Sequence, residues 1–328
     1  MAQVLWCVFC LQKLYLIGGS DCHMKWSWKP KNMNESPLLS IVIANYNYGR
    51  FLETAIRSVV CQNMGNEVEL IVCDAASSDN SVEVIRKFQK NISWWCSEED
   101  GGQSAAFNKG FSHARGRFLT WLNADDILLP KALMAFKKAV LIHPNCEWFG
   151  GGCIQMDPEM RVYKCDRARG ISSRRAEYGL VTVTGPSSFF SRELYLRVGK
   201  IDERFQYMMD TDLWVKFATV GKAKYVPFAS YVWGLRLHPG AKMSGHKFAP
   251  NGTILEGKAS EVAYKRDKKR FAQLELESKW IHEGLPMGSR RMSRLSRFLT
   301  TSFAAAFLSR YDTWRLRGKK MVCVGDSK

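Results

Sequence analysis

Apolar residues in the first half of the chain follow two alternating patterns. Short continuous apolar runs are typical of strands buried on both faces of a sheet. Such runs occur at residues 40–44, 69–73, 94–95 and 117–122. Between them, apolar side chains recur at helical spacing, which predicts helices at residues 51–60, 78–88, 103–114 and 130–142. Asn80 and Glu83 have the spacing of a capping box at the start of the second helix.

This alternation predicts an α/β fold, with a mostly parallel sheet covered by helices on both faces. In such sheets, ligands bind outside the carboxyl ends of the strands. Asn45, Asp74 and Asp125 each follow one of the predicted strands. We therefore expect these three polar segments to lie around one crevice.

The remaining segments are less regular. We expect strands at residues 148–156 and 225–233, and helices from about residue 191 and at 210–220. Residues 1–37 show neither period and end in a linker-like stretch. The predicted organisation is an N-terminal appendage (1–37), an α/β domain (38–246) and a basic helical C-terminal extension (247–328).

Composition narrows the class of protein. The chain has 328 residues, 46% of them hydrophobic and 24% charged, and no apolar run reaches the length of a membrane span. Its ten cysteines are not spaced as a disulfide framework, which favours a reducing, cytoplasmic compartment. Cys7, Cys10, Cys22 and His23 have poor spacing for a zinc site.

Positive charge gathers in the C-terminal quarter. The net charge is +17, and residues 241–328 hold nineteen lysines and arginines against eight acidic residues. No nucleic-acid-binding motif accompanies this charge, so we expect no nucleic-acid partner. Residues 292–307 have apolar side chains near helical spacing, and arginines precede or flank them. The pattern fits a helix lying peripherally on the inner face of an anionic membrane, and equally a helix packed on the domain.

Residues 121–126 place candidate metal-binding side chains at the end of a predicted strand. An apolar run delivers Asn123 and the adjacent carboxylates of Asp125 and Asp126. Mn²⁺ and Mg²⁺ accept oxygen ligands and are often held by one or two carboxylates together with phosphate oxygens. Two acids after a strand are also ordinary turn and helix-cap chemistry. The segment by itself leaves both interpretations open.

Six segments in order resemble the family-2 glycosyltransferases of the GT-A fold. They are residues 41–47, 74–79, 100–110, 123–126, 209–214 and 236–238, so the resemblance covers about residues 38–243. It implies transfer of a sugar from a nucleotide-diphosphate donor to a saccharide or lipid-linked acceptor hydroxyl, with inversion at the anomeric carbon. It also implies a divalent cation, Mn²⁺ or Mg²⁺, and a setting in surface polysaccharide or glycolipid synthesis.

Residue by residue, the resemblance assigns places around the donor. Asn45, Tyr46 and Asp74 match the segments that line the base and ribose. Gln103, Asn108 and Lys109 match the helix that faces the donor. Asn123 stands where the family has the first acid of its Asp-x-Asp motif, which keeps a hydrogen-bonding group and removes a charge.

The resemblance also assigns the reacting centre. Asp125 takes the place of the metal ligand, and His238 is a candidate further ligand. Arg236 belongs to a segment expected to close over the diphosphate. Asp210 takes the place of the catalytic base. Asp212 is expected to hold local structure, because residues two apart on a helix do not share a face.

Two other functions stay open on the sequence. A nucleotidylyltransferase would want a glycine-rich basic phosphate loop after the first strand, and only Arg50 lies near residues 44–49. A nucleotide-sugar-binding or scaffold protein with a degenerate site is suggested by Asn123, and by Ala75 and Ala76, where relatives often carry glycines.

Overall fold

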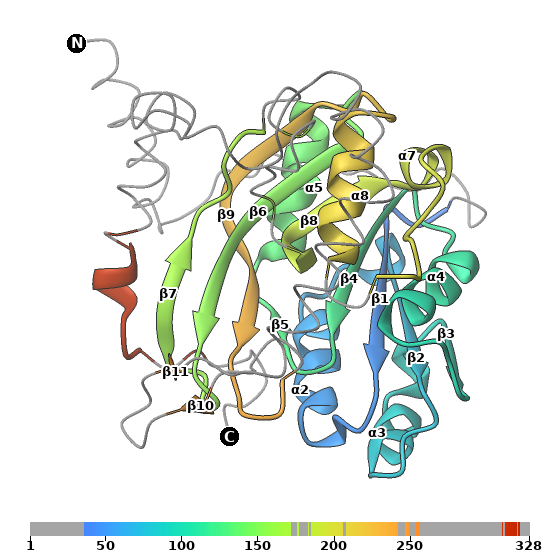
Figure 1. Cartoon of the computed structure of the whole chain (residues 1–328), viewed down its shortest axis with the longest axis vertical. Helices are drawn as coiled ribbons and strands as arrows, with labels where there is room; N and C mark the ends of the chain where they lie inside the picture. Colours follow the sequence, from blue (N-terminus) through green and yellow to red (C-terminus); the bar gives the residue numbers. More distant parts are fainter. Residues whose placement is uncertain are drawn as a thin grey trace, which may run out of the picture. The chain divides into compact units, whose positions relative to one another are not determined.

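The computed structural model describes residues 36–171, 176, 183, 185–205, 208–241, 247–248, 254–255, 310, 312–319 and 321. Within these residues, nine strands form one sheet in the order β3-β2-β1-β4-β8-β6-β9-β5, with β7 paired to β6 (Figure 1). The strands are β1 (Leu39–Asn45), β2 (Val68–Asp74), β3 (Trp94–Ser97), β4 (Phe118–Asn123), β5 (Ile127–Leu128), β6 (Trp148–Met156), β7 (Val162–Asp166), β8 (Ser188–Ser191) and β9 (Tyr225–Arg236). Two further short strands, β10 (Lys247–Phe248) and β11 (Ile254–Leu255), pair with each other.

The helices follow the predicted alternation closely. They are α2 (Gly49–Val60), α3 (Ser81–Lys87), α4 (Gln103–His113), α5 (Ala132–Ile142), α7 (Arg192–Arg197) and α8 (Met209–Ala218), with a 3-10 turn, η3 (Gly185–Ser187), before β8. The α/β class with helices on both faces of the sheet is confirmed.

The parallel part of the sheet aligns the strand ends where the sequence places polar residues. β1 pairs in parallel with β2 and with β4, and β2 pairs in parallel with β3. Asn45 lies opposite Asp74, and Ala44 lies opposite Asn123. The carboxyl ends of these strands therefore meet at one edge of the sheet, as expected.

The other half of the sheet is mixed rather than mostly parallel. β8 runs antiparallel to both β4 and β6, β7 runs antiparallel to β6, and β5 runs antiparallel to β9. Only β6 and β9 are parallel to each other here. A short connection such as the one between β6 and β7 permits only antiparallel pairing, because a parallel partner needs a long crossover.

Alternate residues of each central strand enter two separate cores. On β1, Ile41 and Ile43 pack in a cluster with residues of α2, α3 and α5. Val42 faces the opposite side and packs in a cluster with residues of α4, α7 and α8. All three side chains are completely buried. This two-sided burial explains why the strands have continuous apolar sequences.

The predicted capping box is wrong. Asn80 precedes α3, but its side chain makes no capping hydrogen bond. Its backbone angles, φ −75° and ψ 15°, differ from the extended conformation of a capping residue. Asp79 takes the role instead, because its carboxylate accepts hydrogen bonds from the N–H groups of Ser81 (3.0 Å) and Gly49 (2.8 Å).

Residues 312–319 of the C-terminal extension pack on β7. Residues 312–316 are helical, and Asp312 forms an ion pair with Arg167 at 2.7 Å. The N–H of Gly318 donates to the carbonyl of Val162 (2.8 Å), and the N–H of Val162 donates to the carbonyl of Lys319 (2.8 Å). Residues 292–307, for which a basic amphipathic helix was predicted, lie outside the described residues. None of the described helices is long and apolar enough to cross a bilayer.

Candidate functional site

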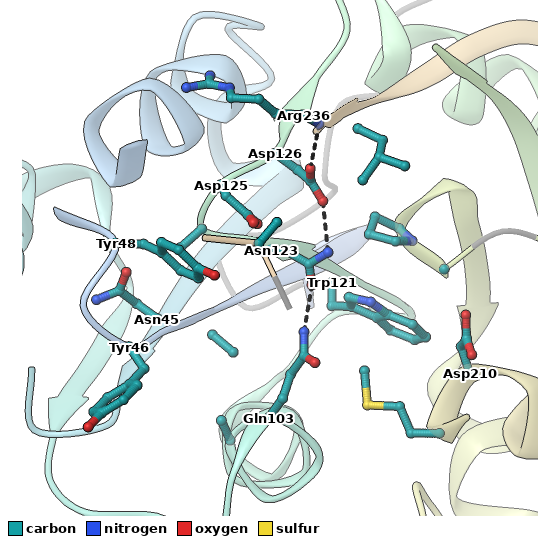
Figure 2. A pocket seen from close by; sticks show the side chains of 18 of the residues that line it. Asn45, Tyr46, Tyr48, Gln103, Trp121, Asn123, Asp125, Asp126, Asp210 and Arg236 are labelled. Atoms are coloured by element: carbon teal, nitrogen blue, oxygen red, sulfur yellow. Dashed lines mark hydrogen bonds between the residues drawn. The ribbon is translucent and has the colours of Figure 1, made fainter. Parts of the chain in front are cut away.

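A cavity of about 1060 Å³ opens at the carboxyl ends of β1 and β4 and extends toward β6 and β9. Figure 2 shows Tyr46 and Asp210 on opposite sides of it, with Asn123 and Trp121 between them. Asn45, Gln103, Asp125 and Arg236 also line it, so the cavity collects most of the candidate residues from the sequence: Asn45, Tyr46, Gln103, Asn123, Asp125, Asp210 and Arg236.

The turn after β4 gives its two adjacent carboxylates different partners. Asp125 Oδ2 lies 3.1 Å from His238 Nε2, just beyond the end of β9. Asp126 accepts hydrogen bonds from the backbone N–H of Arg236 (3.0 Å) and from Asn123 Nδ2 (2.7 Å). Burial, and next the negative charge of Asp125, raises the pKa of Asp126 well above its usual value. Asp125 is thus the carboxylate paired with an imidazole, and Asp126 ties the turn to β9.

Asn123 links α4 to this turn. Gln103 Nε2 donates to Asn123 Oδ1 at 2.8 Å, and Asn123 Nδ2 donates to Asp126 (Figure 2). Both ends of the Asn123 amide are therefore engaged. An aspartate at this position could not make the second hydrogen bond while ionised, because a carboxylate only accepts.

His238 is held by aromatic side chains from the start of α2. Its ring centroid lies 4.5 Å from that of Phe51 and 5.6 Å, edge-on, from that of Tyr48. Tyr48 also donates its hydroxyl to the carbonyl of Gly240 at 2.7 Å. His238 is 1% exposed, so the orientation of its ring is fixed by this packing.

Arg236 contributes its backbone to the site and packs its guanidinium on α2. The guanidinium carbon lies 4.7 Å from the centroid of the Phe51 ring, a cation–π arrangement. In this structure the side chain is buried against that ring.

The Asp125–His238 pair fits a divalent cation that takes its other ligands from phosphate oxygens or water. A carboxylate oxygen and an imidazole nitrogen 3.1 Å apart can both reach one ion, and the imidazole favours a transition metal such as Mn²⁺ over Mg²⁺. Among the described residues, no group of three or more His, Cys, Asp or Glu side chains is placed to bind an ion. A cation here would therefore depend on a ligand for part of its coordination.

Asp210 lies in the first turn of α8 on the far side of the cavity (Figure 2). Burial raises the pKa of its carboxyl, while a hydrogen bond from the Thr211 N–H (2.7 Å) acts in the opposite direction. A Cβ added to Gly185 would lie 3.6 Å from Asp210 Oδ2 and 3.6 Å from the Trp121 ring. Glycine at 185 thus leaves open space between this carboxylate and the indole.

Asp212 has a different environment from Asp210. It is completely buried and forms an ion pair with Lys216 at 2.7 Å, one helical turn further along α8. It does not line the cavity. The two aspartates point to different surroundings, as expected for residues two positions apart on a helix.

Asp74 ends β2 and does not line the cavity. Its carboxylate accepts hydrogen bonds from Asn45 Nδ2 (2.6 Å), the Ser77 N–H (3.0 Å) and Ser97 Oγ (2.6 Å). It is 1% exposed. In this structure Asp74 therefore joins the ends of β1, β2 and β3, and it places Asn45 at the wall of the cavity.

Asn108 and Lys109 also lie away from the cavity. Asn108 Nδ2 donates to the carbonyl of Ile201 (2.9 Å), and Lys109 forms an ion pair with Glu98 (2.9 Å). The two residues follow Gln103 by five and six positions, so at 3.6 residues per turn they fall on other faces of α4. The helix presents Gln103 to the cavity and uses these side chains for packing.

The cavity wall also includes residues that the sequence did not single out, among them Gln155, Asp166, Met208 and Gly185. Gln155 is a polar residue inside the apolar run of β6, which is the one signal that the sequence carried for this part of the wall. The others have no local pattern that distinguishes them from loop or core residues.

The chain is similar in sequence to known glycosyltransferases. Residues 40–196 match glycosyl transferase family 2. An uncharacterized glycosyltransferase of Mycobacterium tuberculosis is 30% identical over 193 residues, which cover 57% of this chain and 71% of that protein. An uncharacterized glycosyltransferase of Methanocaldococcus jannaschii is 35% identical over 189 residues, covering 56% of this chain and 65% of that protein.

The fold has a counterpart among solved structures. A mannosyltransferase from Pyrobaculum calidifontis, in complex with GDP-Man and Mn²⁺, superposes with a TM-score of 0.50 over 86% of this chain and 84% of that protein, at 17% identity. The GT-A fold expected from the sequence is therefore confirmed. The sequence matches establish that the chain is a glycosyltransferase and belongs to glycosyl transferase family 2.

Proposed function

We propose that this glycosyltransferase moves a sugar from a nucleotide-diphosphate donor to an acceptor hydroxyl, with inversion at the anomeric carbon. The observation that carries the proposal is that Asp125, which lies 3.1 Å from His238, and Asp210 both line one cavity. At about 1060 Å³, that cavity is at the upper end of the range for ligand pockets and has room for two substrates.

The donor is proposed to lie along the carboxyl ends of the parallel strands. Its base would lie near Asn45 and Tyr46, and its ribose near Asn123 and Gln103, with the diphosphate at Asp125. In this arrangement Asp74, Asn108 and Lys109 act by holding β1 and α4 in place, because their side chains are engaged elsewhere. The Pyrobaculum calidifontis mannosyltransferase, which has the same fold, is in complex with a nucleotide-sugar.

Asp125 and His238 are proposed to hold a divalent cation, Mn²⁺ in preference to Mg²⁺. When bound, the cation would neutralise charge on the leaving diphosphate. The protein's own contribution is to fix the two ligands: Phe51 and Tyr48 orient the imidazole, and Asp126 anchors the turn that carries Asp125.

Asp210 is proposed to be the catalytic base. It lies across the cavity from Asp125 (Figure 2), so it can accept a proton from an acceptor hydroxyl that attacks the face of the sugar opposite the diphosphate. A carboxylate whose pKa is raised by burial is a stronger base once ionised. Attack from that side gives inversion.

Neither alternative function is favoured by the site. The turn between β1 and α2 has no glycine-rich basic phosphate loop, and the family is one of glycosyltransferases. A saccharide or lipid-linked acceptor, and peripheral contact of residues 292–307 with an anionic membrane on the cytoplasmic side, stay predictions.

The test is to incubate the full chain with UDP-glucose, UDP-N-acetylglucosamine and GDP-mannose, and to follow nucleoside diphosphate release and thermal stabilisation. We expect one donor to raise the melting temperature in the presence of Mn²⁺ and to be hydrolysed slowly, with both effects lost in EDTA. Asp125→Asn should reduce both effects, and Asp157→Asn, on the exposed β6–β7 turn, should not. Absence of binding and hydrolysis with every nucleotide-sugar would contradict the proposal.

A further inference from the structure

The cavity continues past the turn after β4 onto the face of β6, β7 and β9. Its wall there includes Cys153, Gln155, Asp166, Trp233 and Leu235. In the register of the sheet, Cys153 lies opposite Asp166 on one side and Trp233 on the other. Residues paired across neighbouring strands project from the same face, so these side chains form one continuous surface.

This surface and the proposed site of the donor's nucleobase lie on opposite sides of Asp126. The sheet order places β1, which carries Asn45, on one side of β4, and β6 on the other side beyond β8. Cys153 lies opposite Asp166 in the sheet register, and burial, followed by the charges of Asp126 and Asp166, raises the pKa of its thiol. The β6–β7 surface is therefore next to the reacting centre but away from the nucleotide.

Gln155 and Asp166 form a polar dyad in this surface. Gln155 Nε2 donates to Asp166 Oδ2 at 3.0 Å, and Lys164 Nζ lies 2.8 Å from the same oxygen. The hydrogen bond sets the orientation of the Gln155 amide. The two other oxygen atoms of the dyad are Asp166 Oδ1 and Gln155 Oε1. Neither forms a hydrogen bond or an ion pair with another described residue. The Asp166 side chain is 27% exposed, so it is accessible from the cavity.

These two oxygen atoms can only accept hydrogen bonds, so they suit a ligand that presents hydrogen-bond donors close together. Adjacent hydroxyl groups of a sugar ring supply this, and a charged acceptor oxygen makes such hydrogen bonds stronger. A phosphate that is fully ionised has no donor to offer these acceptors, and an acyl chain would leave them without a partner.

We propose that the Gln155–Asp166 dyad is an acceptor subsite that binds a saccharide unit through adjacent hydroxyl groups. The proposal rests on the proposed function, since it assumes that the sugar acceptor enters this cavity. It assigns the substrate as a glycan or glycoside, rather than a bare lipid or a protein side chain.

The test measures binding of methyl glycosides of glucose, galactose, mannose and N-acetylglucosamine to the full chain by saturation-transfer NMR. The protein is loaded with Mn²⁺ and with whichever nucleoside diphosphate stabilises it most. We expect at least one glycoside to bind. Asp166→Ala should raise its Kd by about tenfold or more, and Gln155→Ala by several-fold, because each removes a hydrogen-bond acceptor. Glu159→Gln is the matched control, since this exposed carboxylate on the β6–β7 turn pairs with Arg161 outside the cavity.

The result also separates this subsite from the donor site. Asp166→Ala should weaken glycoside binding far more than binding of the nucleoside diphosphate. If no glycoside binds to a protein that hydrolyses its donor, or if Asp166→Ala binds it as tightly as the parent, the subsite is wrong and the proposed function stands. If no donor binds or is hydrolysed, the proposed function itself fails.

Discussion

Asp125 Oδ2 and His238 Nε2 lie 3.1 Å apart although 113 residues separate them in the chain. Asp125 comes from the turn after β4 and His238 from the residues after β9, and these strands are not neighbours in the sheet. Asp126 holds the two segments together through the Arg236 N–H. The proposed metal site therefore depends on how β9 packs against the β4–β5 turn.

His238 should set the metal requirement of the enzyme. His238→Gln removes the imidazole ligand while keeping a polar side chain, so the Mn²⁺ concentration for half-maximal donor hydrolysis should rise by roughly tenfold or more. His113→Gln is the control, because His113 stacks on Trp94 with ring centroids 3.7 Å apart, away from the cavity. If the two variants need the same Mn²⁺ concentration, His238 is not a metal ligand.

Substitution of Asp210 should reduce turnover, whereas substitution of Asp212 should reduce stability. Asp210→Asn is expected to abolish transfer while nucleoside diphosphate still raises the melting temperature, because it removes the base and not the donor contacts. Asp212→Asn removes the buried ion pair with Lys216, which should lower the free energy of unfolding by roughly 3 kcal/mol. Steady-state kinetics and urea unfolding of both variants measure the difference. Retained turnover in Asp210→Asn would contradict the assignment.

The pKa of Asp210 should be visible in both rate and stability. Since burial raises this pKa above its ordinary value of 3.8, the base loses its function at a higher pH than an exposed aspartate would, and the acidic limb of the kcat profile moves upward. Because the folded state binds this proton more tightly than the unfolded state, the group favours folding below its unfolded pKa. That contribution is lost as pH rises through the folded pKa.

The stability of Asp210→Asn relative to the parent should consequently increase with pH across that window, since asparagine does not titrate. Urea unfolding at several pH values in EDTA measures the difference. A constant difference between the two proteins would show that the pKa of Asp210 is the same folded and unfolded.

Restoring the acid that the family carries at position 123 should destabilise this protein. Asn123→Asp removes the hydrogen bond to Asp126 and places a third carboxyl beside Asp125 and Asp126. We expect the free energy of unfolding at pH 7 in EDTA to fall by about 1–3 kcal/mol. Asn91→Asp adds the same charge at an exposed position and should have little effect. An unchanged stability would mean that Asn123 is not a structural link in this site.

The sequence by itself determined the central strands and helices of the first half of the fold. The apolar runs of β1, β2 and β4 and the helical spacing in α2 and α4 are local patterns, and each strand is buried on both faces. Because parallel strands end at one edge of a sheet, the grouping of the strand ends that carry Asn45, Asp74 and Asp125 could also be predicted. The resemblance to the family then named Asp125, Asp210 and His238 as candidates.

Only the tertiary structure decided which of these side chains line the cavity. Asn108 and Lys109 are on the expected helix, yet the rotation of α4 directs them to Ile201 and Glu98. Asp74 ends the expected strand, yet hydrogen bonds from β1 and β3 engage its carboxylate. Gln155 and Asp166 enter the cavity wall because β6 and β7 pair beside β9. These outcomes depend on contacts between distant segments, and local periodicity carries no information about such contacts.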